Sequence, residues 1–157
     1  MDKEFLGYYW LKQGFSTWFR CLFRLIENTP FIVEPLHDGL FEYFDKLYNQ
    51  QVTRLNINVP PRSGKTTLAT YLVVYALTKN PKSNIIYTSF SQTLLNDIAS
   101  RVKDILENPI YKSLYPSSMN YQEEETSPID DFWLDYLKKE SGKNTYSTKR
   151  ITTYHKK

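Results

Sequence analysis

One stretch, Arg54–Thr67 (RLNINVPPRSGKTT), constrains the fold more than any other part of the chain. It begins with a strand-like run, Leu55–Val59, turns through two prolines and Gly64, and enters an apolar helix at Lys65. A loop between a strand and a helix N-terminus gathers backbone N–H groups and partial positive charge at one point, which favours an anion. Gly64 lets the backbone approach that anion closely. The stretch therefore predicts a phosphate-binding loop.

The end of this stretch fits the phosphate-loop pattern G-x-x-x-x-G-K-[ST]. In that pattern the lysine contacts the outer phosphates and the following hydroxyl holds a magnesium ion. Gly64, Lys65 and Thr66 match it, whereas Val59 stands at the first glycine position. We expect ATP and Mg2+ as cofactors, with Thr66 as the metal ligand. The predicted binding residues of the loop are Pro61, Arg62, Ser63, Gly64, Lys65, Thr66 and Thr67.

The loop itself, Pro60-Pro61-Arg62-Ser63-Gly64-Lys65-Thr66, resembles that of the terminase large subunits of tailed bacteriophages, the motors that pump DNA into a procapsid. The similarity extends from about Phe31 to Pro116 and includes the Tyr87–Gln92 and Asn108–Pro116 segments. The resemblance implies packaging of double-stranded viral DNA in the bacterial host cytoplasm. It also implies a small terminase subunit, a portal protein and a homo-oligomeric ring as partners.

Two site residues have alternative interpretations. By the resemblance, His37 on the preceding helix lies near the adenine, although a lone histidine beside an apolar stripe is more often structural. Arg62 would bring a guanidinium within reach of the γ-phosphate, where it would act with Lys65 in catalysis or report the nucleotide state to a neighbouring subunit. The alternative for Arg62 is a surface arginine on an exposed loop.

The order of the predicted elements sets the expected fold class. After Leu55–Val59 we expect a helix over 65–79, a strand over 84–89 and a helix over 91–107 that Ser91 caps. Such alternation predicts an α/β phosphate-loop NTPase fold, with helices flanking a parallel sheet. Further along, residues 130–139 could form a short helix, and residues 146–154 a strand.

The chain before the loop is expected to be helical. Apolar residues at helical spacing within residues 5–27 predict an amphipathic helix that packs on the core, docks a partner or lies on a membrane surface, but does not span one. A second helix over 35–48 would bury the stripe Leu36, Leu40, Tyr43, Phe44 and Leu47. We therefore divide the chain into an N-terminal amphipathic helical segment, 1–30, and a partial ATPase domain, 31–157.

The general composition fits an intracellular globular chain. Cys21 is the only cysteine, so no internal disulfide can form, and the net charge of +3 is too small to argue nucleic-acid binding by itself. No apolar run ending in an aspartate follows the loop, and no nuclease-like carboxylate cluster is evident. We expect the amino-terminal part of a terminase large subunit, truncated inside its ATPase domain and inactive alone. The alternatives are another phosphate-loop NTPase, such as a helicase, or a degenerate non-catalytic prophage fragment.

Overall fold

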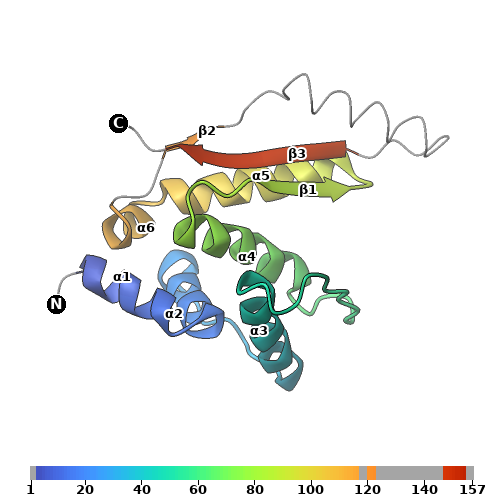
Figure 1. The fold of residues 1–157 in the computed structure, drawn as a ribbon, viewed down its shortest axis with the longest axis horizontal. Coiled ribbons are helices and arrows are strands. Elements are labelled where there is room, and N and C mark those ends of the chain that lie inside the picture. The colour runs from blue at the N-terminus through green and yellow to red at the C-terminus, as the bar shows by residue number, and fades with distance from the viewer. Residues whose placement is uncertain (1–2, 117–119, 123–146, 155–157) are drawn as a thin grey trace.

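An apolar helix, α4 (Lys65–Lys79), occupies the middle of the fold (Figure 1). Apolar and aromatic residues face nearly all directions around it, so it needs neighbours on several sides. The computed structural model describes residues 3–116, 120–122 and 147–154, with side chains for residues 3–116. Seven residues of α4 are buried: Leu68, Thr70, Tyr71, Val73, Val74, Tyr75 and Leu77.

The first two helices, α1 (Lys3–Lys12) and α2 (Phe15–Glu27), are separated by Gln13 and Gly14. Gly14 has a φ of 99°, a conformation that favours glycine, and a Cβ at this position would lie 2.7 Å from the Asp45 carboxylate. The predicted apolar face of α2 is buried in the same core as α4 through Phe15, Trp18, Phe19 and Leu22. Among the described residues, no helix combines the length and hydrophobicity needed to cross a bilayer.

Helix α3 (Pro35–Tyr48) has the predicted bounds, and its buried face includes Phe44 of the predicted stripe but is rotated towards His37 and Phe41. His37, Phe41 and Phe44 are its buried residues, whereas Tyr43 from the predicted stripe is 46% exposed. The aromatic cluster explains the rotation, because the Phe41 ring contacts Phe15 and Phe19 at centroid distances of 5.8 and 5.7 Å. The core therefore buries Phe41 and Phe44 of α3 fully, whereas Leu40 of the predicted stripe is only partly buried against it.

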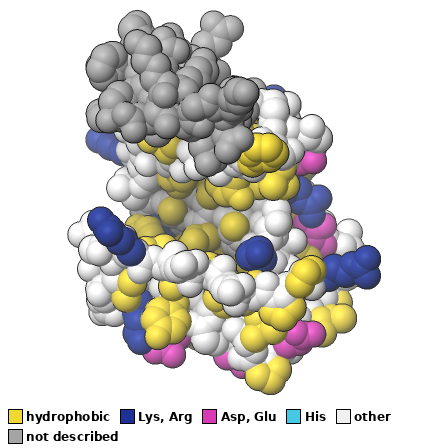
Figure 2. Space-filling model, turned by 90° about the vertical axis from the view of Figure 1, so that its right-hand side faces the viewer, with side chains coloured by type: hydrophobic (Ala, Val, Ile, Leu, Met, Phe, Trp, Pro, Cys, Tyr) yellow, Lys and Arg dark blue, Asp and Glu magenta, His cyan; other side chains and the backbone are white. Residues whose placement is uncertain are grey.

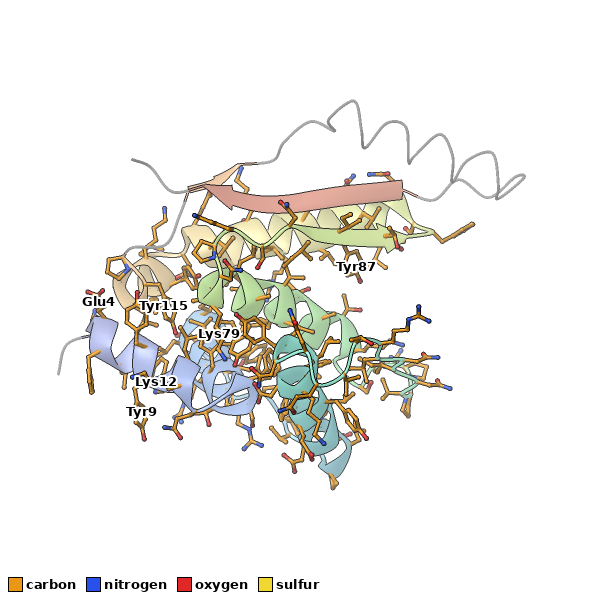
Figure 3. All side chains as sticks on the ribbon, in the orientation of Figure 1. Glu4, Tyr9, Lys12, Lys79, Tyr87 and Tyr115 are labelled. Atoms are coloured by element: carbon orange, nitrogen blue, oxygen red, sulfur yellow. The ribbon has the colours of Figure 1, made fainter. Side chains whose placement is uncertain are left out.

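In the second half of the described chain, α5 has nearly the predicted bounds and a further helix, α6, was not predicted. Helix α5 (Gln92–Glu107) begins at Ser91, whose hydroxyl accepts a hydrogen bond from the Leu94 backbone N–H at 3.3 Å. A short helix, α6 (Pro109–Leu114), follows and lies against α1. The Tyr115 hydroxyl donates to the Gly7 carbonyl at 3.0 Å, and Figure 3 shows Tyr115 between these two helices. This contact joins the two ends of the helical part.

The predicted parallel sheet is wrong. Strand β1 (Ile85–Ser89) pairs antiparallel with β3 (Ser147–Tyr154), with Ile85 opposite Ile151 and Ser89 opposite Ser147. Strand β2 (Asn120–Gln122) also pairs antiparallel with β3, so the sheet order is β1-β3-β2. The described part of the chain is mostly helical and contains no parallel strand pair (Figure 1).

The first predicted strand, Leu55–Val59, is extended but belongs to no sheet. Its residues alternate between half-buried and exposed, as a strand would, yet within the described residues no backbone hydrogen bond pairs it with another segment. A strand adjacent to β1 was needed to make the parallel phosphate-loop fold, and β1 pairs with β3 instead. The α/β phosphate-loop fold class is therefore overturned for this chain. The predicted helix over 130–139 lies outside the described residues.

Candidate phosphate-binding site

The predicted loop ends in an unusual backbone conformation. Arg62 and Gly64 both have positive φ angles, 66° and 72°, with one residue between them. Glycine adopts this region without penalty, whereas arginine does so at a cost of about 1–2 kcal/mol. Gly64 is the N-cap residue of α4, so these two turns direct the chain straight into the helix.

The first turn of α4 leaves backbone donors without helical partners. The helix hydrogen bonds begin with the Leu68 N–H, which donates to the Gly64 carbonyl at 2.9 Å. The N–H groups of Lys65, Thr66 and Thr67 precede this bond, and Gly64 has no side chain to cap them. Because Lys65 and Thr66 are exposed, this end of α4 presents backbone donors, an ammonium and a hydroxyl to solvent. Such an end attracts an anion.

His37 uses one ring nitrogen to cap the start of α3 and the other to contact the loop. Its Nδ1 accepts a hydrogen bond from the Glu34 backbone N–H at 2.8 Å, and its Nε2 lies 2.8 Å from the Ser63 carbonyl oxygen. A carbonyl oxygen only accepts, so Nε2 carries the proton and donates to Ser63, while Nδ1 is unprotonated. The two bonds therefore require the neutral imidazole. His37 is 2% exposed, and a base could hydrogen-bond to it only by replacing one of these partners.

Phe31 packs against the same loop. A Cβ placed on Gly64 would lie 2.8 Å from Cζ of Phe31, so a larger residue would displace this ring, and the φ of 72° also favours glycine. The Phe31 ring also meets the His37 ring edge-on at a centroid distance of 5.1 Å. Phe31 and His37 therefore support the loop from the side of α3.

A cavity of about 320 Å³ opens beside this arrangement. Its size is within the range of small-molecule sites. The Ser63 hydroxyl oxygen is buried and has no hydrogen-bond partner among the described residues, so it is available to a ligand or a water. The residues that line the cavity are Phe23, Thr29, Pro30, Phe31, Ile32, Glu34, His37, Arg62, Ser63 and Gly64.

A second cavity of about 320 Å³ involves Thr66 and Thr67, between α4 and α5. From α5 it is lined by the Asp97 carboxylate and by Arg101, which forms an ion pair with Glu27. Glu27 also accepts a hydrogen bond from the Tyr71 hydroxyl at 3.1 Å. The face at the right-hand side of Figure 1, where the loop before α4 and the end of β1 lie, is hollowed, and hydrophobic side chains line the hollow (Figure 2).

The structure brings the predicted site residues together around the first turn of α4. Arg62, Ser63, Gly64 and His37 line one cavity, and Thr66 and Thr67 line the other. Pro61 and Lys65 are exposed. In the described part of the chain, no group of three or more His, Cys, Asp or Glu residues could hold a metal ion. A metal at Thr66 would therefore need most of its ligands from elsewhere, such as phosphate oxygens or water.

Two supporting residues, Phe31 and Glu34, had no predicted role. Glu34 is the N-cap of α3 and His37 its third residue, so each satisfies a backbone group of the other in a capping box. The Glu-Pro-Leu-His spacing is the sequence signal that could have revealed this arrangement. Nothing in the sequence indicates that Phe31 contacts Gly64, because that contact depends on the tertiary fold.

Comparison of the chain with protein-family models, curated proteins and solved structures finds no match.

Proposed function

We propose that this chain binds the phosphates of ATP at the N-terminus of α4 and is the ATP-binding part of a bacteriophage terminase large subunit. The observation that carries the proposal is the convergence of exposed Lys65, the uncapped N–H groups of the first turn of α4 and the left-handed Gly64. Lys65 would contact the outer phosphates, and Thr66 would hold Mg2+ against them. The proposed partners follow from the resemblance alone; they are duplex viral DNA, the small terminase subunit, the portal protein and further copies of the chain in a ring.

The adenine would occupy the cavity beside the loop. Phe31 and Ile32 offer apolar surface there, and the Ser63 hydroxyl provides a polar group without a partner among the described residues. Gly64 belongs both to this cavity and to the exposed end of α4, so the two places are adjacent. A nucleotide requires such adjacent places, because it carries a base at one end and phosphates at the other.

A second candidate function is a non-catalytic fragment that has lost nucleotide binding. It is favoured by Leu55–Val59, which is extended but has no sheet partner among the described residues. A loop whose preceding segment is not held in a sheet is less rigidly placed, which would weaken phosphate binding.

Binding of a fluorescent ATP analogue, measured with and without Mg2+, tests the proposal. Lys65→Ala should weaken affinity about tenfold or more, because a charge-assisted contact to phosphate is lost. Lys82→Ala is the matched control, since Lys82 is also an exposed lysine and lies beyond the other end of α4.

The two candidates give different results. Saturable binding that depends on Lys65 and not on Lys82 supports the nucleotide site. Absence of binding by the folded wild-type chain, or equal affinity in both variants, contradicts it and supports the non-catalytic fragment.

A further inference from the structure

We propose that His37 is a positioning residue for the phosphate loop, acting through the carbonyl of Ser63 rather than by hydrogen-bonding to the base. The inference rests on the proposed function, because it assigns a role in that same site. It replaces the expectation that His37 lies against the adenine with a role derived from its two hydrogen bonds.

The His37 bond is the main polar connection of the loop. Within residues 3–116, no other hydrogen bond joins Pro60–Ser63 to the rest of the chain. Gly64 and Lys65 follow Ser63 directly, so a movement of Ser63 would move both residues that face the phosphates. A site held to within about 0.5 Å needs such a connection, since small misplacements lower affinity.

The connection is itself well fixed. The imidazole is buried, its Nδ1 is held by the Glu34 N–H, and its ring lies edge-on to Phe31. Glu34 and His37 both belong to the start of α3, which is packed into the core through Phe41 and Phe44. The hydrogen bond from His37 therefore fixes the position of the loop relative to a packed helix.

The two bonds of the imidazole can be separated by substitution. Asparagine places an amide oxygen close to the position of Nδ1, so His37→Asn keeps the acceptor for Glu34 but does not reach Ser63. Glutamine carries an amide nitrogen that can donate to Ser63 and an amide oxygen that, at the third position of a helix, can accept the N–H of the N-cap residue Glu34, so His37→Gln can replace both bonds. His37→Gln is therefore the control for His37→Asn.

The variants should separate nucleotide binding from stability. His37→Asn should lower affinity for ATP about fivefold while its urea midpoint stays close to the wild type. His37→Gln should keep both the affinity and the urea midpoint, because its amide can donate to Ser63 and accept the Glu34 N–H. A purely structural role for His37 would make affinity follow stability in both variants, and that result would overturn the proposal.

Inorganic triphosphate distinguishes positioning from contact with the base. If His37 positions the loop, His37→Asn weakens ATP and inorganic triphosphate by the same factor. If His37 touches the adenine, only ATP is affected, and the positioning role is wrong. If wild-type chain binds neither ligand, the proposed function fails, and the imidazole and loop are then tested without a ligand.

That ligand-free test uses nitrogen NMR of the two histidines, His37 and His155, with His155→Gln to assign them. His37 should appear as the neutral form protonated on Nε2, and His37→Asn should make the backbone of Ser63–Lys65 more mobile while His37→Gln does not. The opposite tautomer, or unchanged loop mobility in His37→Asn, would overturn the positioning role even where no nucleotide binds.

Discussion

The Asp45 carboxylate accepts the backbone N–H of Phe15 with both of its oxygens, each at 3.0 Å. Phe15 is the first residue of α2 and Asp45 belongs to α3, so one helix caps the N-terminus of another. The same carboxylate accepts the Tyr75 hydroxyl of α4 at 3.0 Å. Asp45 therefore joins the three helices that form the aromatic core.

Asp45→Ala should destabilise the protein by about 2–3 kcal/mol, because it removes a helix cap and a charge-assisted hydrogen bond to a buried phenol. Asp38→Ala is a matched control on the same helix. Among the described residues, Asp38 forms a surface ion pair with Arg20 and no other, so its loss should cost less than about 1 kcal/mol. Urea unfolding followed by circular dichroism measures both. Equal losses would mean that the Asp45 contacts do not stabilise the helix junction.

Arg62→Gly should separate backbone strain from charge at the loop. Glycine removes the cost of a positive φ, so the variant should be more stable than Arg62→Ala by about 1 kcal/mol. Both variants lose the guanidinium and should therefore weaken ATP binding, or slow turnover in a full-length enzyme, to the same extent. Unchanged nucleotide binding and turnover would leave Arg62 as a surface arginine.

Alkaline pH should unfold the protein through three buried tyrosines. Burial raises the pKa of Tyr71, Tyr75 and Tyr115. A nearby carboxylate raises the pKa further for two of them, Glu27 for Tyr71 and Asp45 for Tyr75. Tyrosine in the unfolded chain ionises at about pH 10. The contribution of these protonated phenols to the free energy of unfolding is therefore complete below about pH 10 and is lost as the pH rises above it.

Each of these phenols should lower stability by about 1.4 kcal/mol per pH unit above pH 10. Urea midpoints at pH 8, 10 and 11 would show the decline, and tyrosinate absorbance would report ionisation. Tyr71→Phe should reduce the slope, whereas Tyr9→Phe, at an exposed site, should leave it unchanged. A slope that Tyr71→Phe leaves unaltered would contradict the assignment.

The sequence predicted α4 and α5 well because their signals are local, whereas it indicated one helix where α1 and α2 lie and gave no prediction for α6. Apolar spacing and the Ser91 cap placed α4 and α5 within one residue of their observed bounds. The buried face of α3 was predicted less well, because the predicted stripe with Tyr43 and the observed face with His37 and Phe41 are both compatible with helical spacing. Only the aromatic core, with Phe15 and Phe19 on α2, decides between them.

The sheet could not be predicted because strand pairing is not local. Alternation in Leu55–Val59 specifies an extended backbone with one half-buried face, and the structure has both features. Which segment pairs with which depends on tertiary contacts, and here β1 pairs with β3 instead of a parallel neighbour. In the site, the motif located Gly64 and Lys65, whereas the bond from His37 to Ser63 joins residues 26 positions apart and requires the fold.

The unpaired state of Leu55–Val59 gives a prediction for amide hydrogen exchange. Its amides have no backbone acceptor among the described residues, so they should exchange close to the rate of an unstructured chain. Strand β1 is the matched control, since it is also five residues long but is paired with β3, and its bonded amides should exchange much more slowly. Addition of ATP and Mg2+ should slow exchange at Gly64–Thr67, where the free donors of α4 would meet phosphate, and leave Leu55–Val59 unchanged. Strong protection of Leu55–Val59 in the isolated chain would show that this segment has a strand partner, and the antiparallel arrangement described here would then be incomplete.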